Sequence, residues 1–220
     1  LRPSTIYRMF SALQAVISGK YVYDDGKHFR TCAMFKSPLD NPRFQALLSL
    51  LEQIDGEKAI IFCKYSDEVN AICNLLDGKA VKLTGDVPQK IRQDVVNSFA
   101  DSFQYLIANK NCAGYGLNLQ FCRNVIYFSN DWDLATRLQS EDRVHRIGQE
   151  KEVYIYDLIA EHTLDVRIRD CLVRKEHILN ALRGEIDDQK DNKVLLKDWI
   201  KGVIDGDEGI SGKECVRSIS

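Results

Sequence analysis

From residue 58 onward, short apolar runs alternate with longer amphipathic stretches, and no other feature of the sequence constrains the fold as strongly. The runs AIIFC (59–63) and NVIYFS (124–129) are too short for helices and are typical of buried strands. The stretches between such runs space their apolar residues as one face of a helix does. Strands that alternate with helices predict a parallel sheet covered by helices on both faces. The expected fold class is therefore a doubly wound α/β domain.

The two periodicities place the individual elements. Strands are expected at 59–63, 79–83, 103–108, 124–129 and 152–159. Helices are expected at 66–76, 88–99, 134–145 and 163–182. Ser66 is expected to be the N-cap of its helix. Ahead of the sheet, we expect a helix at 4–18 that ends at Gly19, a hairpin at 21–29, and a helix with Pro42 in its first turn.

Changes in composition mark the expected domain boundaries. Residues 1–57 are expected to form a helical run-in, and residues 58–183 the α/β domain. The charged sequence EIDDQKDNK begins the segment 184–204, which we expect to be a linker with a helix at 193–204. Residues 205–220 are polar and rich in glycine, and we expect this C-terminal tail to be disordered.

Charge and cysteine content narrow the functional classes. The chain has 30 Lys and Arg against 32 Asp and Glu, so any contact with nucleic acid must come from a local basic cluster. Its 7 cysteines include no C-x-x-C pair and none at zinc-finger spacing from a histidine. This pattern favours reduced thiols over disulfides or a metal site. No apolar run is long enough to span a bilayer, so we expect no membrane partner.

Two glycines follow the strand expected at 103–108. Gly114 and Gly116 lie in the sequence AGYG, where the chain should leave the carboxyl edge of the sheet. Open α/β sheets bind ligands at that edge. Glycine there lets backbone N–H groups approach a phosphate or a ribose closely. The sequence therefore predicts a ligand-binding turn at 113–116.

A polar stripe follows on the helix expected at 134–145. Gln139, Arg143 and Arg146 are spaced i, i+4 and i+7, so on a continuous helix they share one face. Two guanidinium groups and an amide that converge would bind a polyanion such as a phosphate chain. The alternative is a solvated helix face on which Glu141 and Asp142 pair with the arginines. The spacing alone leaves both interpretations open.

Together, these motifs resemble the C-terminal RecA-like lobe of superfamily-two helicases, in the version found in the Swi/Snf group. The motifs that carry the resemblance are GLNL (116–119), DW (131–132) and RVHRIGQ (143–149). Three further blocks also resemble that family, namely KAIIFCKY (58–65), LTGDVPQKIRQDVVNSF (83–99) and VYIYDLIAEHTLDVRI (153–168). The resemblance covers about residues 1–183 and looks nearest to phage, prophage or bacterial members.

The resemblance implies an ATP-driven translocase of double-stranded DNA. It implies that Arg143 and Arg146 are arginine fingers, that Gln139 fixes them against the nucleotide, and that Gly114 and Gly116 face the nucleotide cleft. For Arg146, a salt bridge within the domain is the alternative. Nothing in the chain matches G-x-x-x-x-G-K-[ST]. ATP and Mg²⁺ would therefore be held mainly by an N-terminal RecA-like lobe that precedes residue 1 of the same polypeptide, and this chain alone is expected to bind neither and to be inactive.

The resemblance also implies that loops after the strands bind DNA phosphates without reading sequence. The residues expected there are Lys64, Tyr65, Thr84, Gly85, Asn109 and Lys110. Asn109 and Lys110 stand where the family often has hydroxyl residues, which makes the assignment to particular residues less secure. Thr84 has the equal alternative of a turn-forming residue before Gly85.

Two other functions remain open at this point. One is a helicase that separates DNA or RNA strands, and the other is a non-catalytic nucleic-acid-binding module. A bacterial or phage protein of this kind is expected in the cytoplasm or on the nucleoid.

Overall fold

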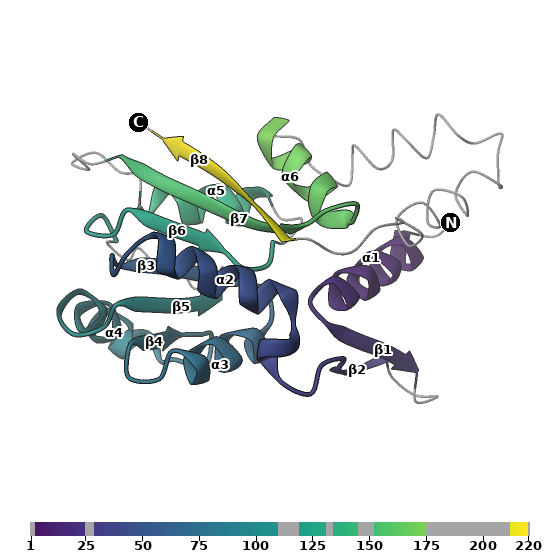
Figure 1. Cartoon of the computed structure of the whole chain (residues 1–220), viewed down its shortest axis with the longest axis horizontal. Helices are drawn as coiled ribbons and strands as arrows, with labels where there is room; N and C mark the ends of the chain where they lie inside the picture. The colour runs from purple at the N-terminus through teal and green to yellow at the C-terminus, as the bar shows by residue number, and fades with distance from the viewer. Residues whose placement is uncertain are drawn as a thin grey trace. The chain divides into compact units, whose positions relative to one another are not determined.

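The computed structural model describes residues 3–24, 29–109, 119–130, 134–144, 152–174 and 212–219 (Figure 1). The chain divides into two compact units. Leu1–Gln45 and Ile159–Lys213 form the first unit, and Ala46–Leu158 and Glu214–Ser220 form the second. Within the described ranges, no helix is both long and apolar enough to cross a membrane.

The second unit is built on a parallel sheet. Its five parallel strands lie in the order β4 (Ala80–Leu83), β5 (Tyr105–Asn109), β3 (Ala59–Cys63), β6 (Asn124–Tyr127) and β7 (Val153–Ala160). The central strand β3 is buried along its whole length, which explains why its sequence is a continuous apolar run. Each expected strand is present to within a few residues, and the doubly wound α/β class is confirmed.

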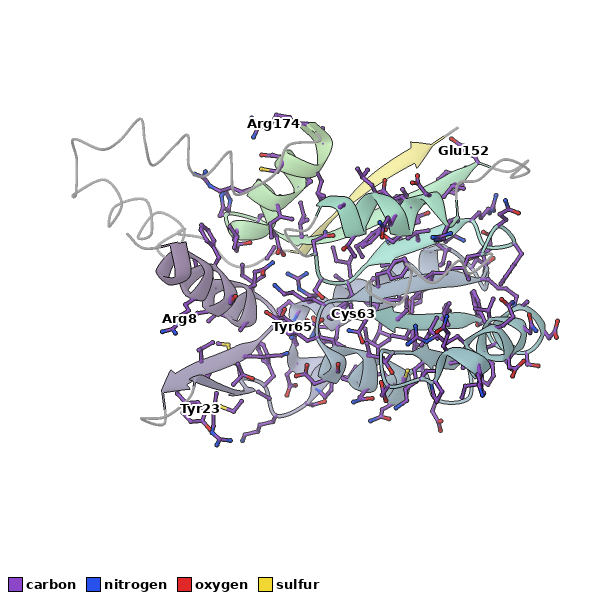
Figure 2. All side chains as sticks on the ribbon, turned by 180° about the vertical axis from the view of Figure 1, so that it is seen from behind. Arg8, Tyr23, Cys63, Tyr65, Glu152 and Arg174 are labelled. Atoms are coloured by element: carbon purple, nitrogen blue, oxygen red, sulfur yellow. The ribbon has the colours of Figure 1, made fainter. Side chains whose placement is uncertain are left out.

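Four helices accompany this sheet, of which α2 precedes its first strand and the others connect strands. They are α2 (Pro42–Gln53), α3 (Ser66–Leu75), α4 (Gln89–Asp101) and α5 (Leu134–Asp142). In Figure 1, α2 lies in front of the sheet, whereas α5 lies on the opposite face, which Figure 2 turns towards the viewer. Coverage of both faces removes the sheet from water, as the apolar strands require.

The beginning of α3 differs from the expectation. Ser66 is the first helical residue and not the N-cap, which is Tyr65. The Tyr65 backbone is extended, and its N–H donates to Oε2 of Glu68 at 3.2 Å. The Glu68 carboxylate, three positions after the N-cap, thus satisfies the backbone N–H of the N-cap residue.

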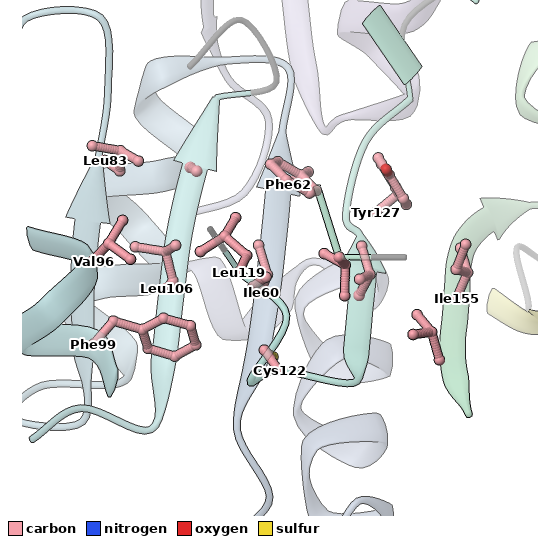
Figure 3. Close-up of a cluster of buried hydrophobic side chains, with 14 residues drawn as sticks. Ile60, Phe62, Leu83, Val96, Phe99, Leu106, Leu119, Cys122, Tyr127 and Ile155 are labelled. Carbon is pink, nitrogen blue, oxygen red and sulfur yellow. The ribbon is translucent and has the colours of Figure 1, made fainter. Parts of the chain in front are cut away.

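The apolar core of the second unit joins strands β3–β7 to the helices (Figure 3). Phe62 of β3 stacks on Tyr127 of β6, with their ring centroids 5.2 Å apart. Cys122 lies in the same cluster, where its thiol donates to the carbonyl of Lys58 at 3.3 Å. Burial raises the pKa of the Cys122 thiol to about 12. The thiol therefore stays protonated at neutral pH and acts as a small apolar side chain.

The first unit combines segments from both halves of the chain. It holds α1 (Pro3–Ile17), the antiparallel strands β1 (Lys20–Asp24) and β2 (Phe29–Ala33), the short 3-10 helix η1 (Pro38–Asp40) and α6 (Leu164–Arg174). Arg43 donates to the carboxylate of Asp165, and both side chains are buried. This ion pair ties α6 to the amino-terminal segment. The sequence predicts a boundary at residue 57, whereas the first unit of the structure consists of Leu1–Gln45 and Ile159–Lys213.

The carboxyl-terminal segment corrects one expectation. Residues 212–219 form strand β8 (Gly212–Ile219), next to β7 in the sheet, so this part of the expected disordered tail is ordered. An unpaired strand edge offers a row of backbone donors and acceptors, and an added strand satisfies them whatever its composition. The expected linker and helix at 184–204 and the end of the helix expected at 163–182 lie outside the described residues.

Gly19 ends α1 as the sequence predicts. Its φ is +80°, and its N–H donates to the carbonyl of Val16 at 2.8 Å. A Cβ at this position would meet Nδ2 of Asn41 at 2.6 Å and the ring of Phe35 at 2.9 Å. Gly78 has a similar φ of +73°, yet a Cβ there would meet nothing within 4 Å. The two glycines share a backbone conformation and differ in packing.

We therefore expect Gly19→Ala to lower the free energy of unfolding more than Gly78→Ala does. Gly78→Ala should cost about 1 to 2 kcal/mol, because an L residue is strained in the left-handed region. Gly19→Ala should cost about 1 to 3 kcal/mol more, because the added methyl group overpacks a closed site. Urea denaturation of both variants measures the difference. Equal losses would show that packing around Gly19 does not matter.

Candidate functional site

Five of the residues expected to bind DNA lie at one edge of the sheet. The strands are parallel, so their carboxyl ends meet at this edge. Lys64 and Tyr65 follow β3, Thr84 and Gly85 follow β4, and Asn109 ends β5. Figure 2 labels Cys63 and Tyr65 where β3 gives way to α3. Four other expected site residues, Lys110, Gly114, Gly116 and Arg146, lie outside the described residues.

Buried polar side chains hold the loop after β3. The Lys64 N–H donates to Oγ of Ser129 at 2.7 Å, and this hydroxyl donates to Oε2 of Glu68 at 2.6 Å. Glu68 is only 3% exposed. The backbone of the loop is thereby fixed, while Nζ of Lys64 lies 5.5 Å from the ring centroid of Tyr65, within cation–π range. Sequence reasoning missed both Ser129 and Glu68 as parts of this site.

Asn109 connects β5 to the same loop. Its Nδ2 donates to the carbonyls of Cys63 and Lys64, both at 3.3 Å. In this arrangement the amide positions the residue that precedes Tyr65. A phosphate contact by Asn109 stays a prediction, and it would have to share an amide that already serves the protein.

The loop after β4 has a different support. Thr84 is 5% exposed, and its carbonyl accepts from the Val87 N–H at 3.0 Å, as in the turn that the sequence allowed. Arg92 of α4 donates through Nε to the carbonyl of Val87 at 2.8 Å and through Nη2 to that of Gly85 at 3.3 Å. Gly85 itself is exposed. The part of this loop that can meet a ligand is therefore the backbone at Gly85 and not the side chain of Thr84.

The helix α5 carries the first two residues of the expected polar stripe. Gln139 is exposed and Arg143 is half-buried. The helix is shorter than expected and ends at Asp142, so Arg143 lies in the turn that follows it. The Val144 N–H donates to the carbonyl of Glu141 at 3.0 Å and closes this turn. Arg143 thus lies immediately after the end of α5, and its neighbour Val144 is buried.

The side chain that α5 turns into the protein is also an arginine. Arg137 is 1% exposed, and its Nη1 and Nη2 donate to Oδ1 and Oδ2 of Asp157 at 2.6 Å and 3.1 Å. Its Nε donates to Glu141 at 2.6 Å, and Nη1 also donates to Oδ1 of Asn130 at 2.7 Å. Its guanidinium carbon lies 3.2 Å from the ring centroid of Tyr127. The N–H groups of this guanidinium thus bind carboxylate and amide oxygens, and its flat face contacts the ring of Tyr127.

Sequence reasoning missed this network because Arg137 stands in a charged stretch that reads as a solvated face. A signal was present in β7. Asp157 interrupts the apolar strand sequence VYIYDLIA, and a carboxylate in a buried strand requires a cationic or hydrogen-bonding partner.

The donors of Arg143 and Gln139 suit phosphate better than metal. A guanidinium and a carboxamide N–H bind phosphate oxygens, whereas Arg offers no lone pair to Mg²⁺. In the part of the chain that the structure describes, no group of three His, Cys, Asp or Glu side chains could hold a metal ion. The side chains of Arg143 and Gln139 carry donors of the kind that binds phosphate oxygens, and a nucleotide contact by either stays a prediction.

Comparison with known proteins shows which family this chain is similar to. Residues 42–148 match the family described as the helicase conserved C-terminal domain. The DNA repair and recombination protein RDH54 of Saccharomyces cerevisiae is 30% identical over 181 residues, which is 74% of this chain and 20% of that protein. The ATP-dependent helicase fft1 of Schizosaccharomyces pombe is 27% identical over 187 residues, which is 82% of this chain and 20% of that protein. The chain thus spans about a fifth of the length of these relatives.

Solved structures support the same fold. The C-terminal part of the Fun30 ATPase domain has a TM-score of 0.54 and 29% identity, and the match covers 58% of this chain and 44% of that one. The Sulfolobus solfataricus SWI2/SNF2 ATPase core domain has a TM-score of 0.54 and 26% identity, and the match covers 78% of this chain and 34% of that one. These matches confirm the RecA-like fold. A phage or bacterial type stays a prediction, because the two curated relatives described above are fungal.

Ser129 provides a test of the loop after β3. We expect Ser129→Ala to lower the free energy of unfolding by about 1 to 3 kcal/mol, because it leaves the buried Glu68 carboxylate without its hydroxyl donor. Amide hydrogen exchange at Lys64 should become faster, since that N–H loses its acceptor. Ser37→Ala is the control, because the Ser37 hydroxyl caps the short helix η1, where it accepts from the Leu39 N–H at 3.2 Å, and has no part in the loop after β3. Unchanged exchange at Lys64 would contradict the assignment.

Proposed function

We propose that this chain, of which residues 42–148 match the helicase conserved C-terminal domain, is the second motor lobe of a Snf2-type, ATP-dependent translocase of double-stranded DNA. The observation that carries the proposal is the set of phosphate-binding donors that α5 and the loops after two strands of the parallel sheet present. Arg143 and Gln139 on and after α5 present phosphate-binding donors, and the loops after β3 and β4 present Lys64, Tyr65 and the Gly85 backbone. One rigid sheet can then position both the residues that bind the nucleotide and the residues that bind DNA.

On the nucleotide side, Arg143 and Arg146 act as arginine fingers. ATP with Mg²⁺, when bound, supplies the phosphoryl group whose charge grows in the transition state. Arg143 donates hydrogen bonds to the phosphate oxygens on which that charge develops. Gln139 orients Arg143 and Arg146 by hydrogen bonding. The P-loop and the magnesium ligands come from an N-terminal RecA-like lobe of the same polypeptide. The chain by itself therefore hydrolyses no ATP.

On the DNA side, the loops hold backbone phosphates. Lys64 supplies charge, and Tyr65 and the exposed Gly85 N–H supply neutral donors, with Asn109 and Lys110 beside them. Such contacts position a duplex without reading its sequence, which suits movement along DNA. Closure of the two lobes on ATP and reopening after hydrolysis would then step the motor along one strand.

The finger role predicts the effect of Arg143→Ala. In the native polypeptide that contains this chain, we expect DNA-stimulated ATP turnover to fall about 10³- to 10⁵-fold, as for other arginine fingers. The thermal midpoint should change little, because Arg143 is not part of the core. Arg123→Gln is the control, since Arg123 precedes β6 and pairs with Glu57, away from the residues proposed to bind ATP. Turnover near the wild-type rate in Arg143→Ala would reject the proposed function.

The DNA role predicts the effects of Lys64→Glu and Lys110→Glu. Each should weaken binding of duplex DNA about equally for all sequences and reduce the salt dependence of binding by about one phosphate contact. Lys79→Glu is the control, because Lys79 is exposed at the opposite edge, immediately before β4. Fluorescence anisotropy over a range of salt concentrations measures both quantities. A residue whose variant binds like the Lys79 control is not a DNA contact.

One alternative function has specific support. The fungal relative fft1 is named an ATP-dependent helicase. Release of a labelled strand from a duplex, coupled to ATP hydrolysis, would favour strand separation over translocation on intact DNA. A cytoplasmic or nucleoid-associated location belongs to the same proposal and depends on a bacterial or phage origin.

A further inference from the structure

The helix α5 packs on the sheet through polar side chains. Among the described side chains of α5, the buried ones are Arg137 and Ser140, and Val144 continues this face just after the helix. A helix on a parallel sheet usually packs by an apolar stripe. Apolar contacts hold a helix without fixing its rotation sharply, whereas hydrogen bonds are directional. The rotation of α5 on the sheet is therefore set by hydrogen bonds.

Ser140 continues the network of Arg137 towards β6. Its hydroxyl donates to the carbonyl of Arg137 at 2.7 Å, so its single hydrogen is used. The Tyr127 hydroxyl, 2.5 Å from Oγ of Ser140, is then the donor in that contact. Burial raises the pKa of Tyr127, which keeps its hydroxyl protonated. Tyr127 thus binds α5 twice, by its hydroxyl to Ser140 and by its ring to the guanidinium of Arg137.

The network connects α5 to two adjacent strands. Asp157 belongs to β7, Tyr127 to β6, and Asn130 follows β6. The amide of Asn130 also donates to Oδ1 of Asp157 at 2.7 Å, so the acceptor itself is held in place. Arg137 is consequently fixed by partners that cannot move unless the sheet moves.

The geometry of a helix carries this constraint to the exposed face. Each residue of an α-helix turns by about 100°, so Gln139 projects about 200° around the axis from Arg137. Arg143 follows the last helical residue by one position. A small rotation of α5 about its axis would therefore move the side chains of Gln139 and Arg143 relative to the sheet. Their placement depends on how Arg137 is held.

We propose that Arg137, bound by Asp157, Asn130, Glu141 and Tyr127, is a positioning residue that fixes α5 so that Arg143 and Gln139 reach the nucleotide. The proposal rests on the proposed function of this edge. Arg137 is fully buried and touches no substrate. It acts on hydrolysis only through the placement of the two residues that do.

The decisive variant removes the two fully buried charges, Arg137 and Asp157, and leaves only Glu141, whose side chain is 11% exposed. Replacing one partner would leave the other as an unpaired buried charge, and the fold could be lost. Replacing a buried ion pair by neutral residues of similar volume is often harmless to stability. The double variant Arg137→Met with Asp157→Asn keeps the volume and leaves an amide for Asn130. It is therefore expected to fold with a thermal midpoint near that of the wild type.

In the native polypeptide that contains this chain, we expect this double variant to hydrolyse ATP with a kcat about 100-fold lower, since misplacement of a reacting group by about 1 Å costs that much. The KM for ATP should be unchanged. Amide hydrogen exchange should become faster in α5 and stay unchanged in β3. A purely stabilising network would leave kcat at the wild-type value once the protein is folded, and that result would overturn the proposal.

The matched control removes another ion pair from the same sheet. Glu57 and Arg123 pair at the amino ends of β3 and β6, and Asn124 also donates to Glu57 at 2.9 Å. The double variant Glu57→Gln with Arg123→Gln should leave kcat unchanged. A comparable fall of kcat in this control would overturn the proposal, because it would show a general effect of lost charge.

A single variant decides the matter if the double variant is unfolded at the assay temperature. Arg137→Lys keeps the positive charge but cannot bind Asp157 through two parallel hydrogen bonds. A folded Arg137→Lys protein with lowered kcat supports the proposal. Wild-type kcat, or failure of this variant to fold as well, overturns it. Wild-type turnover in Arg143→Ala would instead reject the proposed function, so the two failures can be told apart.

Discussion

Parallel pairing of β3 with β5 on one side and with β6 on the other is the interaction on which the rest of the structure depends. It aligns Ala59 with both Tyr105 and Asn124, so the strands run in step to the same edge. Residues that are separated by tens of positions in the sequence, such as Lys64, Asn109 and Ser129, come together only because of this alignment. The stacked rings of Phe62 and Tyr127 and the apolar cluster around them hold the alignment against water (Figure 3).

The loops at the carboxyl edge are shaped by side chains that bind backbone groups. Glu68 and Ser129 hold the loop after β3, and Arg92 holds the loop after β4. Each supporting side chain is itself buried, so its hydrogen bonds face little competition from water. This construction fixes the backbone of both loops, with Lys64 half-buried and Gly85 exposed. A ligand that binds such an edge would not have to order it first, which preserves affinity.

The helix α5 couples this rigidity to the residues proposed to meet the nucleotide. A buried guanidinium is costly to desolvate, and here two carboxylates, an amide oxygen and an aromatic face compensate it. Apolar residues could have packed the same helix at lower electrostatic cost. Directional bonds do what apolar packing does not, because they define one rotation of the helix. We infer that precision of placement, and not stability as such, explains a polar interface at this position.

The sequence by itself determined the parallel α/β class, the order of its strands and helices along the chain, and the left-handed turn at Gly19. These features follow from local periodicity and from the conformational freedom of glycine. Both can be read from residues that are close together in the sequence. It also placed Lys64, Tyr65, Gly85 and Asn109 at one edge, since carboxyl ends of parallel strands converge. The tertiary structure alone decided which cation meets the buried Asp157, because Arg137 lies 20 positions away in a charged stretch that looks solvated when read in sequence. It also decided that residues 212–219 form an edge strand, because an unpaired edge provides hydrogen-bonding partners that no local pattern reveals.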